Sequence, residues 1–388
     1  MSLAEIRYQT AAVRMLRSAV AGDRVAHAYL FVGPRGVGKG LAAREFAKLL
    51  LCAKPRGSGE KLDACDKCAH CTRIDRGTHP DIYWFRKEED RNDFRISIVA
   101  RRVGEESASP SITVTESVML HPMEAARTVT VLDDAELLNR YAANSLLKTL
   151  EEPSPHAVLI LLCADASELP GTILSRCQWV RFGPLPEEFV AEKVREELAA
   201  QAAKPPEKGR KAEPPRPIAR EEIAFICRFA GGSIEQAVQL AGSGLWGLKR
   251  SLLPGLAAMD EADALDMAEA VAGWAVTEAR RLRVPKGSPE ETAVRRSSAR
   301  LALAVVASAL RDAAMVAVGS PEGAGLTNSD QADVIQSLAA WSAESCGRAV
   351  SILADAQAQI LRYVHIELAT ENAFVQVSRL RPAVAARR

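Results

Sequence analysis

The sequence predicts an α/β domain with a parallel sheet, followed by domains that are largely helical. In the first part, short apolar runs alternate with stretches of helical periodicity, and a glycine-rich loop directly follows the first apolar run. Strands that are apolar along their whole length are typical of parallel sheets, because helices cover both faces. The second part, from about residue 245 to 380, is rich in alanine and has mainly helical patterns.

The predicted elements of the first part alternate between helix and strand in the order that parallel sheets require. The helices have apolar residues on one face, whereas the strands are short and either apolar throughout or, at residues 128–132, made of threonine and apolar residues. The expected helices are residues 6–21, residues 41–51 and a helix through residues 144–150 that stops at 151–153; the expected strands are residues 28–32, 128–132 and 157–162.

A chain of 388 residues is long enough for two or three domains. We place the sheet domain at residues 1–184, a small helical domain at 185–243 and a further helical domain at 244–388. Residues 203–218 contain the sequence KPPEKGRKAEPPRP, which predicts a Pro-rich charged loop because it lacks apolar periodicity. Residues 286–291 are also expected to be disordered.

The glycine-rich loop reads GPRGVGKG and matches the phosphate-binding pattern G-x-x-x-x-G-K-[ST] except at its last position. Gly33, Gly36 and Gly38 would let the backbone cradle a phosphate, and Lys39 would contact it. The last position normally supplies a hydroxyl for Mg²⁺, but Gly40 has no side chain. The loop therefore predicts an ATP or ADP site, or a vestigial loop in which Lys39 is a solvated lysine at a helix start.

Two carboxylates, Asp133 and Asp134, follow the expected strand 128–132. In a nucleotide site, Asp133 would bind Mg²⁺. Alternatively, the two residues are a helix N-cap and a first-turn charge. Both interpretations stay open.

Four of the eight cysteines have the spacing C-x₁₂-C-x₂-C-x₂-C, and these are Cys52, Cys65, Cys68 and Cys71. Four thiolates suit a closed tetrahedral Zn²⁺ site, so residues 52–71 predict a structural zinc module. His70 and His79 are alternative ligands, and unrelated cysteines or a redox pair are the alternative to a metal.

Composition excludes some classes of protein. The formal net charge of +1 gives no argument for nucleic-acid binding. No apolar run approaches the roughly 18 residues of a membrane span. Residues 1–16 do not resemble a signal peptide, so we expect a cytoplasmic protein in which disulfides do not form.

The order of these features resembles the AAA+ subunits of the bacterial DNA polymerase III clamp loader. The residues that carry this resemblance include Asp133-Asp134-Ala135-Glu136, the stretch NSLLKTLEEPSPHAVLILL from residue 144, and LPGTILSRCQ from residue 169. The resemblance covers roughly residues 5–240. It implies a P-loop domain with a zinc insertion, a small helical lid domain and a C-terminal helical collar, although the last third matches only in length and helix content.

Departures from the family pattern distinguish its ATPase motor, gamma/tau, from its delta-prime stator. The motor has a hydroxyl-bearing residue where this chain has Gly40. It usually has a glutamate where this chain has Asp134. The motor also has a polar sensor residue, but Cys163-Ala164 stands there. Finally, the motor has an arginine after a Gly-Ser pair, where this chain has Ile234-Glu235. Together these departures predict that the chain has lost hydrolysis.

The resemblance assigns a different role to Arg176, in the sequence Ser175-Arg176-Cys177. In the family this arginine is a finger that acts on ATP bound by a neighbouring subunit; the alternative is a surface ion pair. The implied partners are gamma/tau and delta subunits in a hetero-oligomeric ring, with the sliding clamp and primer-template DNA. The other hypotheses are an active gamma/tau-type ATPase and a stand-alone zinc-binding protein that interacts with DNA.

Overall fold

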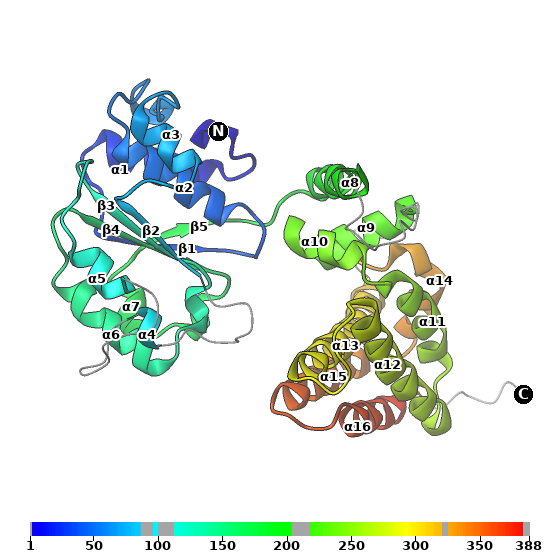
Figure 1. The fold of residues 1–388 in the computed structure, drawn as a ribbon. Helices are drawn as coiled ribbons and strands as arrows, with labels where there is room; N and C mark the ends of the chain where they lie inside the picture. Colours follow the sequence, from blue (N-terminus) through cyan, green and yellow to red (C-terminus); the bar gives the residue numbers. More distant parts are fainter. Residues whose placement is uncertain (1, 87–95, 100–111, 204–217, 320–324, 383–388) are drawn as a thin grey trace, which may run out of the picture. The chain divides into compact units, whose positions relative to one another are not determined.

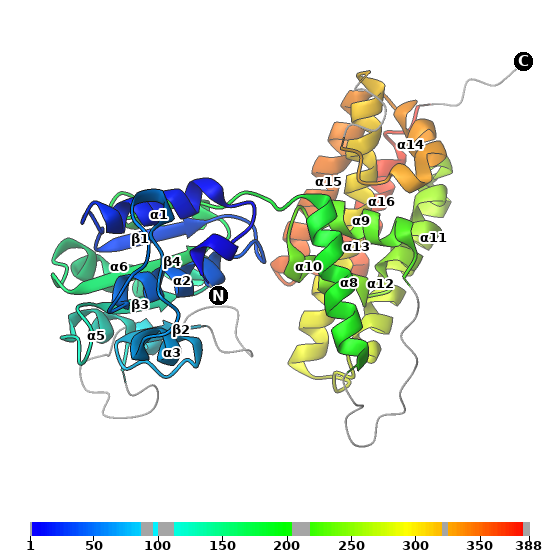
Figure 2. The ribbon, with the colours of Figure 1, turned by 90° about the horizontal axis from the view of Figure 1, so that it is seen from above.

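The computed structural model divides into two compact units, Met1–Pro186 and Glu187–Arg388 (Figures 1 and 2). The separation of the second unit into domains at 185–243 and 244–388 stays a prediction. Most of the predicted loop at 203–218 lies outside the described residues. The structure describes residues 2–86, 96–99, 112–203, 218–319 and 325–382.

The first unit contains a five-stranded sheet in the order β2-β3-β4-β1-β5, with every neighbouring pair parallel. Both β3 and β4 are buried at every position, and β4 is accordingly apolar throughout, whereas β3 encloses Thr128 and Thr130 among its apolar residues. The sequence did not predict β2 and β5, which are short strands at the two edges. The strands are β1 (Ala28–Val32), β2 (Ile82–Phe85), β3 (Thr128–Leu132), β4 (Ala157–Cys163) and β5 (Gln178–Arg181).

Helices cover both faces of this sheet, with α1 and α2 on one face and α5 and α6 on the other (Figure 1). The core between the sheet and the second group contains Leu30, Leu146 and Leu161, none of them accessible to solvent. The helices are α1 (Thr10–Ala21), α2 (Lys39–Leu51), α3 (Ala69–Asp75), α4 (Ile96–Val99), α5 (Val114–Met119), α6 (Arg140–Glu151) and α7 (Gly171–Leu174). The 3₁₀ turns are η1 (Leu3–Glu5), η2 (Gly59–Lys61), η3 (Ala135–Leu137) and η4 (Ala166–Glu168).

The strand register brings the predicted nucleotide-site residues to one edge of the sheet. Val32 of β1 pairs with Cys163 of β4, and the N–H of Gly33 donates to the carbonyl of Cys163 at 3.2 Å. Asp133 follows β3, which lies beside β4. The phosphate loop, the carboxylates and the sensor position therefore meet at the carboxyl ends of the strands, where open α/β sheets bind ligands.

The described residues of the second unit form helices and no strand. Helix α13 packs against α12, α14 and α15. The expected disorder at 286–291 is wrong, because Ser288 caps α13 by accepting the N–H of Glu291 at 3.1 Å and Pro289 occupies the first turn. The helices are α8 (Glu187–Ala203), α9 (Arg220–Phe229), α10 (Ile234–Ala241), α11 (Leu245–Ala258), α12 (Glu261–Arg281), α13 (Pro289–Ala317), α14 (Ala332–Ala339), α15 (Ala343–Leu361) and α16 (Ile366–Ser378), with the 3₁₀ turn η5 (Ser329–Gln331). No helix in the described ranges is long and apolar enough to cross a membrane.

Candidate nucleotide and metal sites

The phosphate loop closes around its own lysine. The ammonium of Lys39 donates to the carbonyls of Gly33 and Pro34 at 2.6 and 2.8 Å, and the side chain is 8% exposed. Burial lowers the pKa of Lys39, and the largest opposing influence is the charge of the Glu136 carboxylate. Gly38 has a φ of +100°, and a Cβ at Gly33 would lie 2.2 Å from the carbonyl oxygen of Phe182, so both positions require glycine.

Gly40 is a different case, because nothing in the packing requires a glycine there. It lies in the first turn of α2, and a Cβ would meet the ring of Trp84 at 3.8 Å and Leu162 at 3.9 Å. These are ordinary van der Waals distances. A serine would therefore fit, and the missing hydroxyl is not a steric consequence of the fold.

Each of the two predicted carboxylates is paired with an arginine. Asp133 Oδ2 lies 3.3 Å from Nε of Arg86, and Asp134 Oδ1 lies 2.8 Å from Nη2 of Arg35. Burial raises the pKa of Asp133, and the neighbouring charge of Asp134 raises it further. Asp134 has a φ of +54° and precedes η3, but its side chain makes no capping hydrogen bond.

Glu136 received no role from the sequence, although it contacts both the phosphate-loop arginine Arg35 and the end of β4. Its Oε1 is 3.2 Å from Nη2 of Arg35, and its Oε2 accepts the N–H of Ala164 at 3.2 Å. Burial raises the pKa of the Cys163 thiol to about 12, with a further contribution from the adjacent Glu136. The sequence offered one signal for Glu136, which is its place three residues after Asp133. A short turn after a strand brings the side chain at that position back toward the edge of the sheet.

Arg86 also received no role from the sequence. It follows β2, and its guanidinium lies over the ring of Trp84, 5.3 Å from the centroid. The side chain is 69% exposed, yet it reaches Asp133 at the end of the neighbouring strand β3. An arginine thus contacts the carboxylate that would bind Mg²⁺ in an ATPase.

Arg176 lies outside this group, in the turn between α7 and β5. Its Nη1 donates to the carbonyl of Thr172 at 2.9 Å, and its Nη2 donates to Glu151 at the end of α6 at 2.7 Å. The arginine side chain is 34% exposed and that of Glu151 is 51% exposed. The resting contact is therefore a surface ion pair that holds the guanidinium in place while leaving part of it accessible.

Glu235, which stands where the motor has an arginine, lies in the first turn of α10, and Ser233 caps this helix.

The four predicted metal-binding cysteines form a cluster in which all sulfur atoms lie within 4.8 Å of one another. Cys52 ends α2, and Cys68 and Cys71 lie at the start of α3. The N–H of Cys65 donates to the Cys52 sulfur, and the N–H of Cys68 donates to the Cys65 sulfur, both at 3.3 Å. Such N–H donors stabilise thiolates, and the backbone N–H groups of Lys67 and Cys68 lower the pKa of Cys65 to about 6. The donor set therefore fits a metal ion.

The two histidines that were alternative ligands contact each other instead. His70 Nδ1 and His79 Nε2 are 2.9 Å apart, and His79 Nδ1 accepts the N–H of Asp81. Within the described residues, the group that could hold a metal contains the four cysteines and no histidine.

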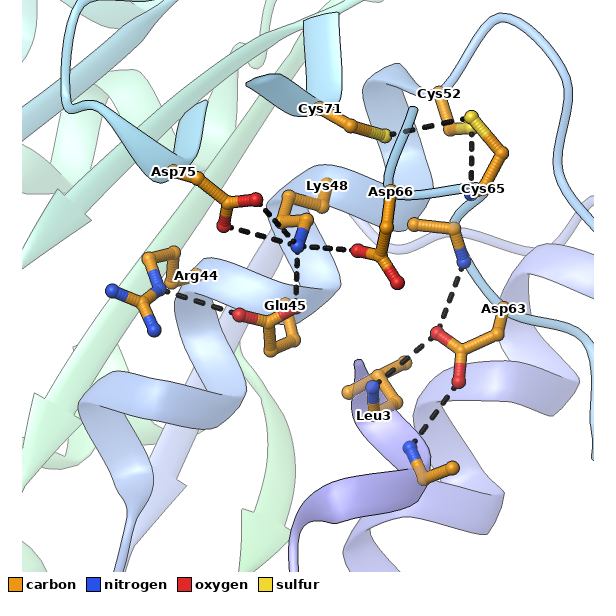
Figure 3. A network of polar contacts seen from close by, with 12 residues as sticks. Leu3, Arg44, Glu45, Lys48, Cys52, Asp63, Cys65, Asp66, Cys71 and Asp75 are labelled. Carbon is orange, nitrogen blue, oxygen red and sulfur yellow. Dashed lines mark hydrogen bonds and ion pairs between the residues drawn. The ribbon is translucent and has the colours of Figure 1, made fainter. Parts of the chain in front are cut away.

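A buried lysine connects this cysteine module to the helix that begins at the phosphate loop (Figure 3). Lys48 of α2 is inaccessible to solvent and forms ion pairs with Glu45, Asp66 and Asp75 at 3.1, 2.6 and 3.0 Å. Burial alone would lower the pKa of Lys48, but the three carboxylates outweigh it and raise the pKa. Asp66 lies between two of the cysteines and Asp75 ends α3, so the lysine fixes the module on α2.

Replacing Lys48 by methionine is expected to destabilise the first unit by about 3–5 kcal/mol, because three carboxylates would lose their shared cation. Urea unfolding, with hydrogen exchange of α2 to localise the effect, measures the loss. The matched control is Lys193→Met, which removes an exposed ion pair with Glu196. That control should cost less than about 1 kcal/mol. Equal effects of the two substitutions would contradict a structural role for the buried pairs.

Residues 8–186 match the profile of a protein family described as "DNA polymerase III, delta subunit". The chain is similar to the delta' and tau/gamma subunits of DNA polymerase III. The predicted resemblance to these subunits is thereby confirmed, as is the fold class of a P-loop parallel sheet with a cysteine insertion and additional helices.

Both types of clamp-loader subunit occur among the relatives. DNA polymerase III subunit delta' of Pseudomonas aeruginosa is 40% identical over 39% of this chain and 42% of its own length. The delta' subunit of Bacillus subtilis is 30% identical over 49% of this chain and 52% of its own length. The tau subunit of Salmonella typhimurium is 28% identical over 70% of this chain but 38% of its own length. The chain thus spans about half or less of the length of these relatives.

Proposed function

We propose that this chain is a non-motor, delta-prime-type subunit of the DNA polymerase III clamp loader, which donates Arg176 to ATP held by a neighbouring subunit. The observation that carries this proposal is the state of the chain's own phosphate loop. Gly40 offers no hydroxyl, and Asp133 is already paired with Arg86. Both contacts that would hold a catalytic Mg²⁺ are therefore missing or taken.

The position of Arg176 supports its role as the donated group. A guanidinium keeps its charge and presents a rigid fork of donors, which suits the charge that develops on a transferring phosphoryl group. Glu151 restrains the side chain in the free subunit through an exposed ion pair. Exposed pairs of this kind contribute at most about 1 kcal/mol, so a phosphate can displace Glu151 at little cost.

The cysteine cluster suits a Zn²⁺ ion with a structural role. Its four thiolates, from Cys52, Cys65, Cys68 and Cys71, fill a tetrahedral coordination sphere and leave no position for substrate. When bound, the ion would join the end of α2 to α3 and fix the fold of residues 52–71.

The partners follow from the same proposal. The chain would assemble with gamma/tau-type and delta-type subunits in a hetero-oligomeric ring, with residues 244–388 as the collar. Its relatives are named as subunits of DNA polymerase III, which supports such a complex. The ring would open a sliding clamp and load it on primed DNA.

ATP turnover by the isolated full-length chain tests the non-motor assignment. We expect no phosphate release above background from the unmodified chain. The double variant Gly40→Ser/Asp134→Glu should also be inactive, because Arg86 still occupies Asp133 and Ala164 supplies no polar sensor. Gly40→Ala is the matched control, since it adds a Cβ without a hydroxyl.

A gamma/tau-type ATPase is the alternative, and one observation favours it: Lys39 is fixed in the loop by the carbonyls of Gly33 and Pro34. Substantial, Lys39-dependent turnover by the unmodified chain would establish this alternative and refute the stator assignment.

A further inference from the structure

The charges around the phosphate loop balance without a metal ion. The acidic groups take part in ion pairs or lie near the loop lysine, so each carboxylate has a cationic neighbour. Among the described residues, three negative and three positive side chains give a formal sum of zero. The group consists of Asp133, Asp134, Glu136, Arg35, Lys39 and Arg86.

The two arginines are responsible for this balance. Without Arg35 and Arg86, one lysine would face three carboxylates, and the formal charge would be −2. An anionic ligand would be repelled by that site unless a divalent cation entered with it. A phosphate loop that uses Mg²⁺ meets this requirement with the ion itself.

The residues present do not fit a Mg²⁺ ion. Mg²⁺ demands near-ideal octahedral oxygen coordination at about 2.0–2.1 Å and binds through carboxylates and phosphates. Gly40 supplies no oxygen, and Nε of Arg86, at the end of the adjacent strand, lies 3.3 Å from Oδ2 of Asp133. Any ion at that position would compete with a guanidinium that stacks on Trp84 as well as pairing with Asp133.

The groups that contact phosphate are nevertheless in place. In the described part of the chain, no hydrogen bond is donated by the backbone N–H groups of Gly36 or Gly38. Lys39 uses two of its three donors on Gly33 and Pro34, which leaves one for a ligand. Backbone N–H groups in such a loop form an anion-binding concavity.

We propose that this loop binds the phosphates of a nucleoside di- or triphosphate without a divalent metal, and that Arg35 and Arg86 supply the charge that Mg²⁺ supplies in an ATPase. Nucleotide held in this way is a bound ligand and not a substrate, because no metal activates its terminal phosphate. The loop is thus a nucleotide-binding site in which two arginines take the place of the metal ion.

Calorimetric titration of the full-length chain with ADP and with ATP tests the proposal. We expect dissociation constants in excess EDTA that are equal to or lower than those in excess MgCl₂. Lys39→Ala should weaken binding at least about tenfold, because the lysine provides a charge-assisted contact to phosphate. Pyrophosphate serves as a probe for the phosphate site alone.

The arginine variants separate this proposal from ordinary metal-dependent binding. Arg86→Ala should weaken ADP binding in EDTA, since Asp133 then repels the ligand. Gly40→Ser/Arg86→Ala should make Mg²⁺ tighten ADP binding by about tenfold, because it frees the carboxylate and adds the hydroxyl. Arg86→Lys keeps the charge and should preserve binding without metal.

Arg76→Ala is the matched control. Arg76 is exposed and lies on the wall of the same cavity of about 840 Å³ as Gly40 and Arg86, but it forms no ion pair with the site carboxylates among the described contacts. It should leave binding unchanged.

Two results would overturn the proposal: ADP and ATP binding that is at least about tenfold tighter with Mg²⁺ in the unmodified chain, or no binding of any of the three probes. Thermal unfolding of each variant shows whether it is folded. The outcome is independent of the donated arginine, since these titrations use the isolated chain and do not involve Arg176.

Discussion

Replacing Arg176 by alanine is expected to slow ATP hydrolysis at the neighbouring site by about 10³-fold or more in a clamp loader reconstituted with this chain. The effect is large because the guanidinium would contact the transferring phosphoryl group directly, where charge develops in the transition state. Single-turnover hydrolysis in the presence of primed DNA and sliding clamp measures the rate at that site. Gel filtration of the same complex measures assembly.

Two further substitutions separate catalysis from structure. Arg176→Lys keeps the charge but loses the planar fork, so it should restore only part of the rate. Glu151→Gln releases the arginine from its ion pair without removing it, and should leave hydrolysis close to that of the unmodified complex. If Arg176→Ala instead prevented assembly, the residue would be part of the subunit interface and the catalytic role would be wrong.

Loss of the metal is expected to unfold the module at residues 52–71. Cys71→Ser removes one ligand from a cluster whose sulfur atoms lie within 4.8 Å of one another, and repulsion among the remaining thiolates then opposes the fold. The free energy of unfolding of the first unit should fall by at least about 4 kcal/mol, the range in which loss of a structural metal lies. A strong chelator should have a similar effect on the unmodified chain.

Metal analysis and thermal unfolding test this expectation together. The unmodified protein should contain bound zinc, and Cys71→Ser should lose it. Cys346→Ser is the matched control, because that buried cysteine lies in the second unit and outside the cluster. A folded protein that contains no metal and is unaffected by chelator would contradict the assignment.

The parts of the site that are contiguous in sequence could be predicted. The phosphate loop combines a strand, a glycine pattern and a helix start within residues 28–41, and the cysteines share one short segment. The buried strands β3 and β4 were equally clear, because every side chain in them is apolar or enclosed. Local signals of this kind do not depend on knowing the tertiary fold.

The contacts that alter the chemistry of the loop could not be predicted in the same way. Arg35 and Glu136 are separated by 101 positions, and they meet only because β1 and β3 flank β4 in the sheet. Arg86 follows β2, an edge strand of four half-buried residues with the sequence IYWF, and this short apolar run was not predicted to be a strand. Ion pairs across a sheet edge depend on strand order, which sequence periodicity does not encode.

The most direct test of a non-motor subunit is Lys39→Ala in the reconstituted clamp loader, compared with Arg176→Ala in the same assay. Lys39 is the residue on which any hydrolysis at this chain's own loop would depend. If the chain hydrolyses no ATP at its own loop and donates Arg176 to the neighbouring site, steady-state ATP hydrolysis with Lys39→Ala should equal that of the unmodified complex, while Arg176→Ala lowers it. A rate that falls with Lys39→Ala and not with Arg176→Ala would contradict the account.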